Sequence, residues 1–153
     1  LMTAGKGISH SEISLVGTDS LHAAQLWLAL PEGERNVEPF FEHHGELPML
    51  HFGDSEAKVF IGSLGTAKSP ATVFSRLVGA ELQVSGQIQL PLDESFEHGI
   101  LVVSGEVEVN GIRVGVDDLI YLPVGEGATV SGKGVALLLG GEPFTEQTAP
   151  TKV

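Results

Sequence analysis

The strongest constraint on the fold is the alternation of apolar and polar residues in AELQVSGQIQLPL, residues 80–92. The apolar set is Leu82, Val84, Ile88 and Leu90, and the polar set is Gln83, Ser85, Gln87 and Gln89. Successive side chains of a β-strand point to opposite faces of the sheet. This segment is therefore expected to form a strand with one dry face and one wet face.

Further strand signals follow in the second half of the chain. In EVEVNGIRV, Asn110 and Gly111 lie between two alternating runs, and both tolerate the positive φ of a tight turn, so a β-hairpin is predicted. DDLIYLPVGEGATV and GKGVALLLGG repeat the pattern of strand and turn. With 20 glycines, 8 prolines and no long run of helical period, the sequence favours an all-β sandwich or small barrel.

Two different segments occupy the first 50 residues. In LHAAQLWLAL, residues 21–30, leucines alternate with Trp27 and Ala29, as is typical of a mostly buried strand. The next segment, residues 31–50, is rich in Pro, Gly and Glu and predicts an exposed connection. Trp27 and the pair Phe40-Phe41 are expected to pack in a core or between domains.

The composition excludes several partners and sites. With a formal charge of −12 and only eight Lys and Arg residues, no direct nucleic-acid surface is expected. The absence of Cys removes disulfides, thiolate catalysis and Cys-ligated zinc. No apolar run approaches the roughly 20 residues of a membrane span and no signal peptide is visible, so we expect no membrane association and a cytoplasmic location. Because residue 1 is Leu, we expect the natural protein to begin upstream.

His10 and Glu12 are the candidate metal ligands. They lie two residues apart, behind the glycines Gly5 and Gly7. On an extended strand, residues i and i+2 share a face, so the two side chains would project side by side. An imidazole and a carboxylate together suit a divalent metal such as iron, manganese or zinc. A surface ion pair between the two side chains is the alternative, because a spacing of two residues suits an ion pair as well as a metal site.

The residues around this pair resemble the second metal-binding motif of the pirin family of bicupins. That motif is a Met-x-Ala-Gly-x-Gly turn followed by x-x-His-Ser-Glu, and it is matched by Met2, Ala4, Gly5, Gly7, His10, Ser11 and Glu12. HAAQLWLALP and NVEPFFEHHGELP are similar to a strand and a linker of the family. FEHGILVVSGEVEVNG and ALLLGGEPFTEQ resemble its later cupin strand and closing segment. The similarity covers most of the chain.

The resemblance implies an all-β cupin fold, a double-stranded β-helix with a jelly-roll-like barrel. Pirin-like proteins contain two tandem barrels, and the first holds an iron-type metal on three His and one Glu. By this match residues 1–45 are the C-terminal part of the metal-binding N-terminal cupin with its linker. Residues 46–153 are then the C-terminal cupin, so the chain would hold one complete barrel and part of a preceding one.

The same match makes His10 and Glu12 two of the four metal ligands. The other two, a His-x-His pair, would lie upstream of Leu1. The implied cofactor is a divalent transition metal, first of all Fe, with Mn, Zn, Ni and Cu as alternatives. Glu12 could also serve as a catalytic base if substrate displaced it from the metal.

The second barrel departs from the usual cupin motif G-D-x-x-x-x-P-x-G-x-x-H. Asp117 stands in place of the Gly, and Ala128 stands in place of the ligand His. The remaining positions are kept by Asp118, Pro123 and Gly125. Before VVSGEVEV there is His98 but no His-x-His pair. This barrel is therefore expected to lack a metal.

Two functions of different classes follow from the resemblance. Some family members have quercetin 2,3-dioxygenase activity, so the intact protein is expected to be a metal-dependent oxygenase of a small aromatic substrate. The alternative is a non-enzymatic protein of the transcriptional-cofactor type, whose metal responds to redox state and alters its binding to a partner. We expect this chain alone to be inactive. Unpaired strand edges in residues 1–45 predict a homodimer or a complementing N-terminal fragment.

Overall fold

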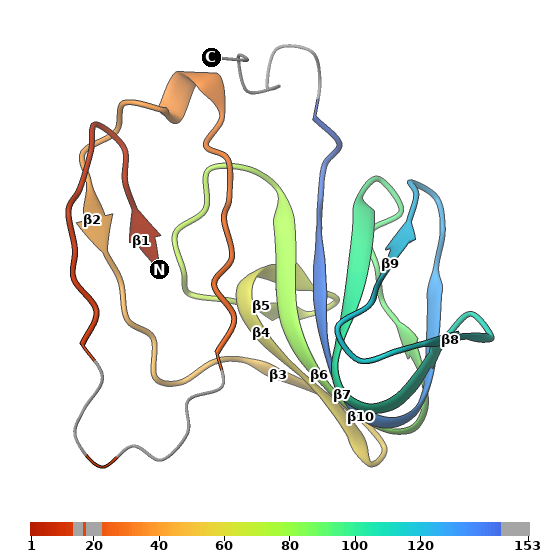
Figure 1. The fold of residues 1–153 in the computed structure, drawn as a ribbon. Helices are drawn as coiled ribbons and strands as arrows, with labels where there is room; N and C mark the ends of the chain where they lie inside the picture. Colours follow the sequence, from red (N-terminus) through yellow and green to blue (C-terminus); the bar gives the residue numbers. More distant parts are fainter. Residues whose placement is uncertain (14–16, 18–22, 145–153) are drawn as a thin grey trace. The chain divides into compact units, whose positions relative to one another are not determined.

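The structure, a computed structural model, describes residues 1–13, 17 and 23–144 of the 153-residue chain (Figure 1). The described residues divide into two units, Leu1–Glu42 and His43–Phe144. Strands and one short 3₁₀ helix are the regular elements of these residues, which confirms the all-β prediction. No helix in this part of the chain is long and apolar enough to cross a membrane.

The first unit has little regular structure. Its elements are β1 (Met2–Thr3), the 3₁₀ helix η1 (Glu32–Glu34) and β2 (Phe40–Phe41). Strands β1 and β2 pair antiparallel, with Met2 opposite Phe41 and Thr3 opposite Phe40. Thr3 is the one residue of this unit that is buried among those described.

The second unit is a rolled antiparallel sheet (Figure 1). Its strands are β3 (Met49–Phe52), β4 (Ser55–Leu64), β5 (Ala67–Lys68), β6 (Leu77–Leu90), β7 (Glu97–Val109), β8 (Ile112–Val114), β9 (Leu119–Leu122) and β10 (Ala128–Gly141). The order in the sheet is β3-β4-β6-β10-β7-β8, with β5 beside β4 and β9 beside β7. Strand β10 lies between β6 and β7 and pairs with both along most of its length.

Glycines allow the long strands to bend. Gly132 of β10 has a φ of +118° and lies opposite Gly86 of β6, whose φ is +103°. A Cβ at Gly132 would come within 2.2 Å of the Glu106 carbonyl oxygen on β7, whereas a Cβ at Gly86 would meet nothing within 4 Å. Gly132 is therefore required both by its backbone conformation and by the close approach of the neighbouring strand.

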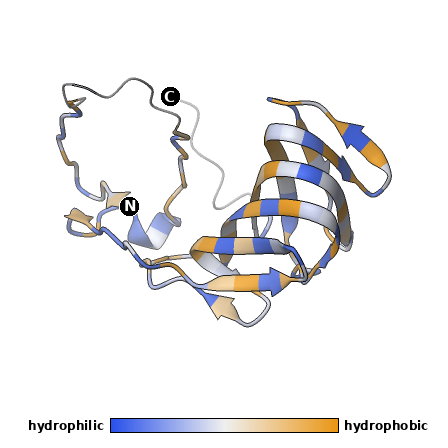
Figure 2. Cartoon of the chain, turned by 90° about the horizontal axis from the view of Figure 1, so that it is seen from below, coloured by the Kyte–Doolittle hydropathy of each residue, from blue (hydrophilic) through white to orange (hydrophobic). Residues whose placement is uncertain are grey.

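The rolled sheet encloses the apolar core. Figure 2 shows apolar and polar residues alternating along its strands. On β6 the apolar residues at 82, 84, 88 and 90 are buried and the polar residues at 83, 85, 87 and 89 are exposed, as the alternation predicted. Burial of these side chains, at roughly 25 cal/mol per Å² of apolar surface, is the main stabilising contribution to this unit.

The predicted hairpin is also present. Asn110 and Gly111 have φ values of +51° and +79° and connect β7 to β8. The Asn110 side-chain amide donates to the Gly127 carbonyl (2.9 Å), and its oxygen accepts from the Thr129 backbone N–H (2.8 Å). The turn residue therefore also joins the hairpin to the start of β10.

The predicted strand at residues 21–30 is wrong for its described part. Residues 23–30 form no strand, and Leu26, Trp27 and Leu28 are exposed, with Trp27 at 90%. Phe41 is exposed as well, so it is not a core residue of this chain. The alternating pattern determines which side chains share a face, but a strand also needs a neighbour to complete its hydrogen bonds. Within the described residues, no neighbouring strand pairs with 23–30.

Candidate metal centre

The turn before His10 is held against the segment that precedes β2. Gly5 and Gly7 have φ values of +47° and +124°, and Gly7 N–H donates to the Ala4 carbonyl at 2.8 Å. Lys6 N–H donates to the Val37 carbonyl at 3.0 Å, and a Cβ at Gly5 would come within 2.0 Å of that same oxygen. A side chain at position 5 is therefore excluded, which explains the glycine there.

Further contacts fix the same stretch of chain. Leu1 and Glu42 exchange two hydrogen bonds of 2.9 Å, one from the Leu1 backbone nitrogen and one from the Glu42 N–H. The Lys6 ammonium forms an ion pair with Glu38. Residues 1–6 are thus aligned along residues 37–42, and this alignment places the start of the segment that carries His10.

His10 and Glu12 lie side by side, as predicted, although they do not belong to a strand. The distance from His10 Nε2 to Glu12 Oε1 is 3.7 Å. The side chains are 47% and 80% exposed, so both can turn toward a ligand without opening a core. This arrangement suits either a weak surface ion pair or two ligands of an incomplete metal site.

The donor set around the pair is incomplete. The described residues contain no group of three or more His, Asp or Glu side chains close enough to hold a metal. Stable transition-metal sites in proteins have three or four protein ligands. His10 and Glu12 therefore fit part of a metal site, and the other ligands would have to come from outside the described residues.

In the second unit, the position of the ligand His in the cupin motif is occupied by a side chain that cannot bind a metal. Ala128, which stands in place of the ligand His, is fully buried in the core. Asp117, in place of the motif glycine, has a φ of +67°, so the backbone keeps the left-handed conformation that glycine favours. His98 is buried at the start of β7. The expectation that this barrel lacks a metal stays a prediction.

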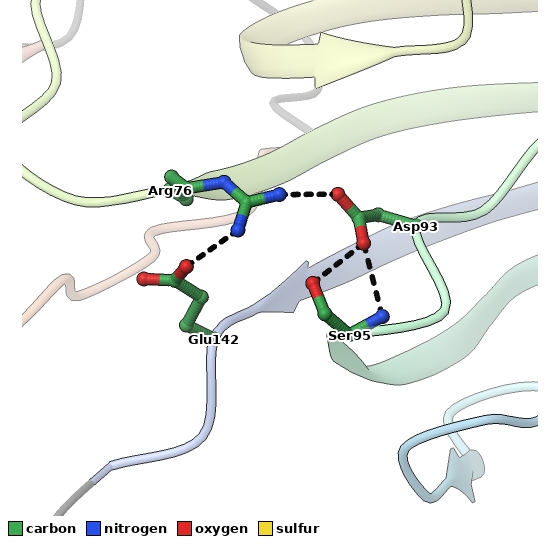
Figure 3. A network of polar contacts seen from close by, with 4 residues as sticks. All are labelled: Arg76, Asp93, Ser95 and Glu142. Carbon is green, nitrogen blue, oxygen red and sulfur yellow. Dashed lines mark hydrogen bonds and ion pairs between the residues drawn. The ribbon is translucent and has the colours of Figure 1, made fainter.

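A polar network at one end of the rolled sheet was not predicted from the sequence. The Arg76 guanidinium lies 2.6 Å from Asp93 Oδ2 and 2.6 Å from Glu142 Oε1 (Figure 3). Asp93 Oδ1 accepts from the Ser95 backbone N–H at 2.9 Å and from its hydroxyl at 2.6 Å (Figure 3). The Ser95 hydrogen bonds, then Arg76, lower the pKa of Asp93. These residues are up to 66 positions apart in sequence, so no local pattern could reveal the contacts.

An open depression of about 470 Å³ adjoins this network. Its lining includes Arg76, Asp93 and Phe96 together with Lys68 and Leu77. The Arg76 guanidinium lies over the Phe96 ring, 5.1 Å from its centroid, a geometry that favours a cation–π interaction.

Comparison with known proteins gives the family. Residues 77–150 match the Pirin C-terminal cupin domain. The "Putative quercetin 2,3-dioxygenase" of Pseudomonas aeruginosa is 40% identical over 149 residues, which cover 94% of this chain and 47% of that protein. A pirin-like protein of Caulobacter vibrioides is 33% identical over 153 residues, covering 93% of this chain and 52% of that protein. The chain thus spans about half the length of these relatives.

A crystal structure of quercetin 2,3-dioxygenase from Acinetobacter baumannii is similar to this chain, with a TM-score of 0.88 and 37% sequence identity. The similarity covers 94% of this chain and 50% of that chain. It confirms the predicted cupin fold, while the assignment of residues 1–45 to a preceding cupin stays a prediction. On the combined evidence of the matched domain, the relatives and the fold, the chain belongs to the pirin family.

Proposed function

We propose that His10 and Glu12 supply two ligands of a divalent transition-metal centre in a quercetin 2,3-dioxygenase-like oxygenase. The observation that carries this proposal is the 3.7 Å approach of an imidazole nitrogen to a carboxylate oxygen on a segment positioned by the Gly5–Gly7 turn. The names of the Pseudomonas and Acinetobacter relatives support an oxygenase. The substrate would be a small aromatic molecule of the flavonoid type.

The remaining ligands would come from a His-x-His pair, carried either by an upstream segment or by a second polypeptide. A homodimer and a complementing N-terminal fragment are the two forms that the second polypeptide could take. Iron is the first choice of metal, because imidazole with carboxylate suits redox-active Fe. Mn, Zn, Ni and Cu remain alternatives that metal competition would rank.

His10 and Glu12 would bind the metal, and Glu12 would also accept a proton. The metal, when bound, supplies the redox chemistry needed for dioxygen to react. Ligation needs a neutral His10 and an ionised Glu12, so metal binding releases protons and weakens in acid. Glu12 would accept a proton from a phenolic hydroxyl of the substrate, because its exposed carboxylate is free to turn away from the metal position.

The first test is metal analysis after anaerobic incubation with Fe(II) and dialysis, with the completing His-x-His ligands supplied by the upstream segment or the second polypeptide. We expect His10→Ala and Glu12→Gln to lower Fe(II) affinity by about tenfold or more, since each removes a ligand. The matched control is His51→Ala, because His51 is exposed and its Nδ1 lies 3.8 Å from Oε2 of the half-buried Glu56 in another His–carboxylate pair. Equal Fe(II) retention by wild type and His10→Ala would contradict the proposal, as would an equal loss in the control.

Oxygen uptake separates the oxygenase from the non-enzymatic, redox-responsive alternative. With the completing ligands supplied, we expect quercetin to stimulate O₂ consumption and Glu12→Gln to lower the rate. A preparation that holds Fe(II) through His10 but consumes no O₂ with quercetin or a related flavonoid would keep the metal site and overturn the oxygenase.

A further inference from the structure

His98 is a buried histidine that the proposed metal centre does not use. It is 2% exposed and lies on β7, whose next inward residues are the core residues Ile100 and Val102. Its neighbours in register are Leu122 on β9 and Gly140 on β10. A Cβ at Gly140 would come within 2.4 Å of His98 Cδ2, so the glycine leaves room for the imidazole ring.

The imidazole is buried without a hydrogen bond. Neither ring nitrogen has a partner among the described residues, and both are inaccessible to solvent. Its ring contact is with Phe96, at 6.0 Å between centroids and a tilt of 37°. Buried polar side chains nearly always have a partner, and leaving one unpaired is unfavourable. Burial lowers the pKa of His98, and the Asp93 carboxylate opposes this only in part.

Phe96, at the end of the turn that begins at Asp93, contacts the His98 ring and also lines the open depression, which His98 itself does not line. Phe96 lines the depression and carries the Arg76 guanidinium over its face. Arg76 is held in turn by Asp93 and Glu142, and Asp93 is held by Ser95, which joins the turn to the ends of β6 and β10 (Figure 3). The turn is therefore fastened by exposed polar contacts, which are individually weak in water.

Among the described residues, each acidic side chain near His98 already has a partner. Asp93 is the acid that acts on His98, and it is already paired with Arg76. Glu142 is also paired with Arg76, and Glu97 accepts a hydrogen bond from the Tyr121 hydroxyl at 2.8 Å. On β9 and β10 the register partners Leu122 and Gly140 are uncharged. Within this described part of the chain, an imidazolium at position 98 would thus be buried without a free acid to pair with.

We propose that His98 is a pH-dependent conformational switch. Its protonation opens the Asp93–Phe96 turn, so that the imidazolium reaches water and the Asp93 carboxylate. The depression beside the turn provides room for Phe96 to move. Because the closed state disfavours the charged ring, the ratio of open to closed molecules rises by up to about tenfold for each pH unit below roughly 6.5. The rise ends once the closed state itself takes up the proton.

Hydrogen exchange of the full 153-residue chain between pH 5.5 and 7.5 tests whether protonation of His98 opens the turn. Each amide rate is divided by the rate of an unstructured peptide at the same pH. In wild type we expect peptides covering residues 91–103 to lose protection toward pH 5.5, by up to about tenfold per pH unit. Peptides from the middle of β6 and from β4 are expected to keep their protection, because the opening is local.

Variants and a direct titration make the test decisive. His98→Leu should remove the pH dependence at residues 91–103, while His51→Leu, which changes an exposed histidine, should retain it. If His98→Leu fails to fold, the ring protons of His98 in wild type are followed by NMR, and a midpoint below 6.5 is expected. A midpoint at or above 6.5, pH dependence that survives in His98→Leu, or equal loss of protection across all strands would overturn the proposal.

Discussion

Residues 23–30 and the strand β6 share an alternating sequence pattern, but the apolar side chains are mostly exposed in the first and mostly buried in the second. Both alternate large apolar residues with other side chains, yet Leu28 is exposed and Leu82 is fully buried. The difference lies in the neighbours, because β6 pairs with β4 and β10 on its two sides, whereas no strand of the described residues pairs with 23–30. Alternation thus predicts which side chains share a face, and burial depends on what the rest of the chain places against that face.

The largest expected effect contrasts these two leucines directly. Leu82→Ala should lower the free energy of unfolding by about 2–5 kcal/mol, since it leaves a cavity in a closed core. Leu28→Ala should change it by less than about 0.5 kcal/mol, because the side chain is already exposed. Urea denaturation followed by circular dichroism measures both. A large loss in Leu28→Ala would show that this segment has a packing partner in solution.

The paired glycines sharpen the comparison within the rolled sheet. Gly132→Ala should be destabilising by about 1–3 kcal/mol, because it combines a left-handed φ with a clash against the Glu106 carbonyl. Gly86→Ala has a similar φ but open space, so it should lose less. The same urea titration gives the difference, which isolates the steric contribution. Equal losses would mean that the strands separate enough to admit a methyl group.

Because His98 is buried, we expect the free energy of unfolding of the second unit to decrease in acid. The pKa of His98 is lowered in the folded state, so the unfolded chain takes up a proton first as the pH falls. Stability from this residue is therefore complete above about pH 6.5 and declines below it by up to about 1.4 kcal/mol per pH unit. Unfolding free energies measured from pH 8 to 5 in wild type and His98→Leu give the contribution as their difference. A difference that is flat across this range would contradict the assignment.

The smallest expected effect concerns the first unit. Gly5→Ala places a methyl group against the Val37 carbonyl and should displace the turn that positions His10. We expect Fe(II) retention to fall while the unfolding midpoint of the rolled sheet stays within about 0.5 kcal/mol of wild type. Gly7→Ala is the comparison, because Gly7 also has a positive φ but a Cβ there meets nothing within 4 Å, so the difference between the two variants isolates the clash with the Val37 carbonyl. Destabilisation of the sheet by Gly5→Ala would show that the units are energetically coupled.

The features that could be predicted from the sequence depend on residues that are close to one another in the chain. The faces of β6 follow from alternation, and the β7–β8 hairpin follows from Asn110-Gly111, because both depend on residues close in sequence. The proximity of His10 and Glu12 was likewise predicted from a spacing of two, even though the segment is not a strand. The contacts of Arg76 with Asp93 and Glu142 could not be predicted, since they arise only when the ends of three distant segments meet.

The unpaired state of His98 was also beyond sequence reasoning. A histidine in a strand usually finds a hydrogen-bond partner, and nothing in EHGILVV indicates otherwise. Its isolation follows from its inward position and from Leu122 and Gly140 as cross-strand neighbours. Those neighbours are set by the register of the sheet, which a single sequence does not reveal.

The central position of β10 has a consequence for synthesis of this protein. Residues 128–141 are the last of the eight strands to leave the ribosome, yet they form the middle of the sheet. Until they emerge, β6 and β7 each expose the edge that pairs with β10 in the described structure. Contacts between residues this distant in sequence form slowly, and open edges invite pairing with other chains. Until its own last strand closes it, the nascent barrel is therefore exposed to pairing with other chains.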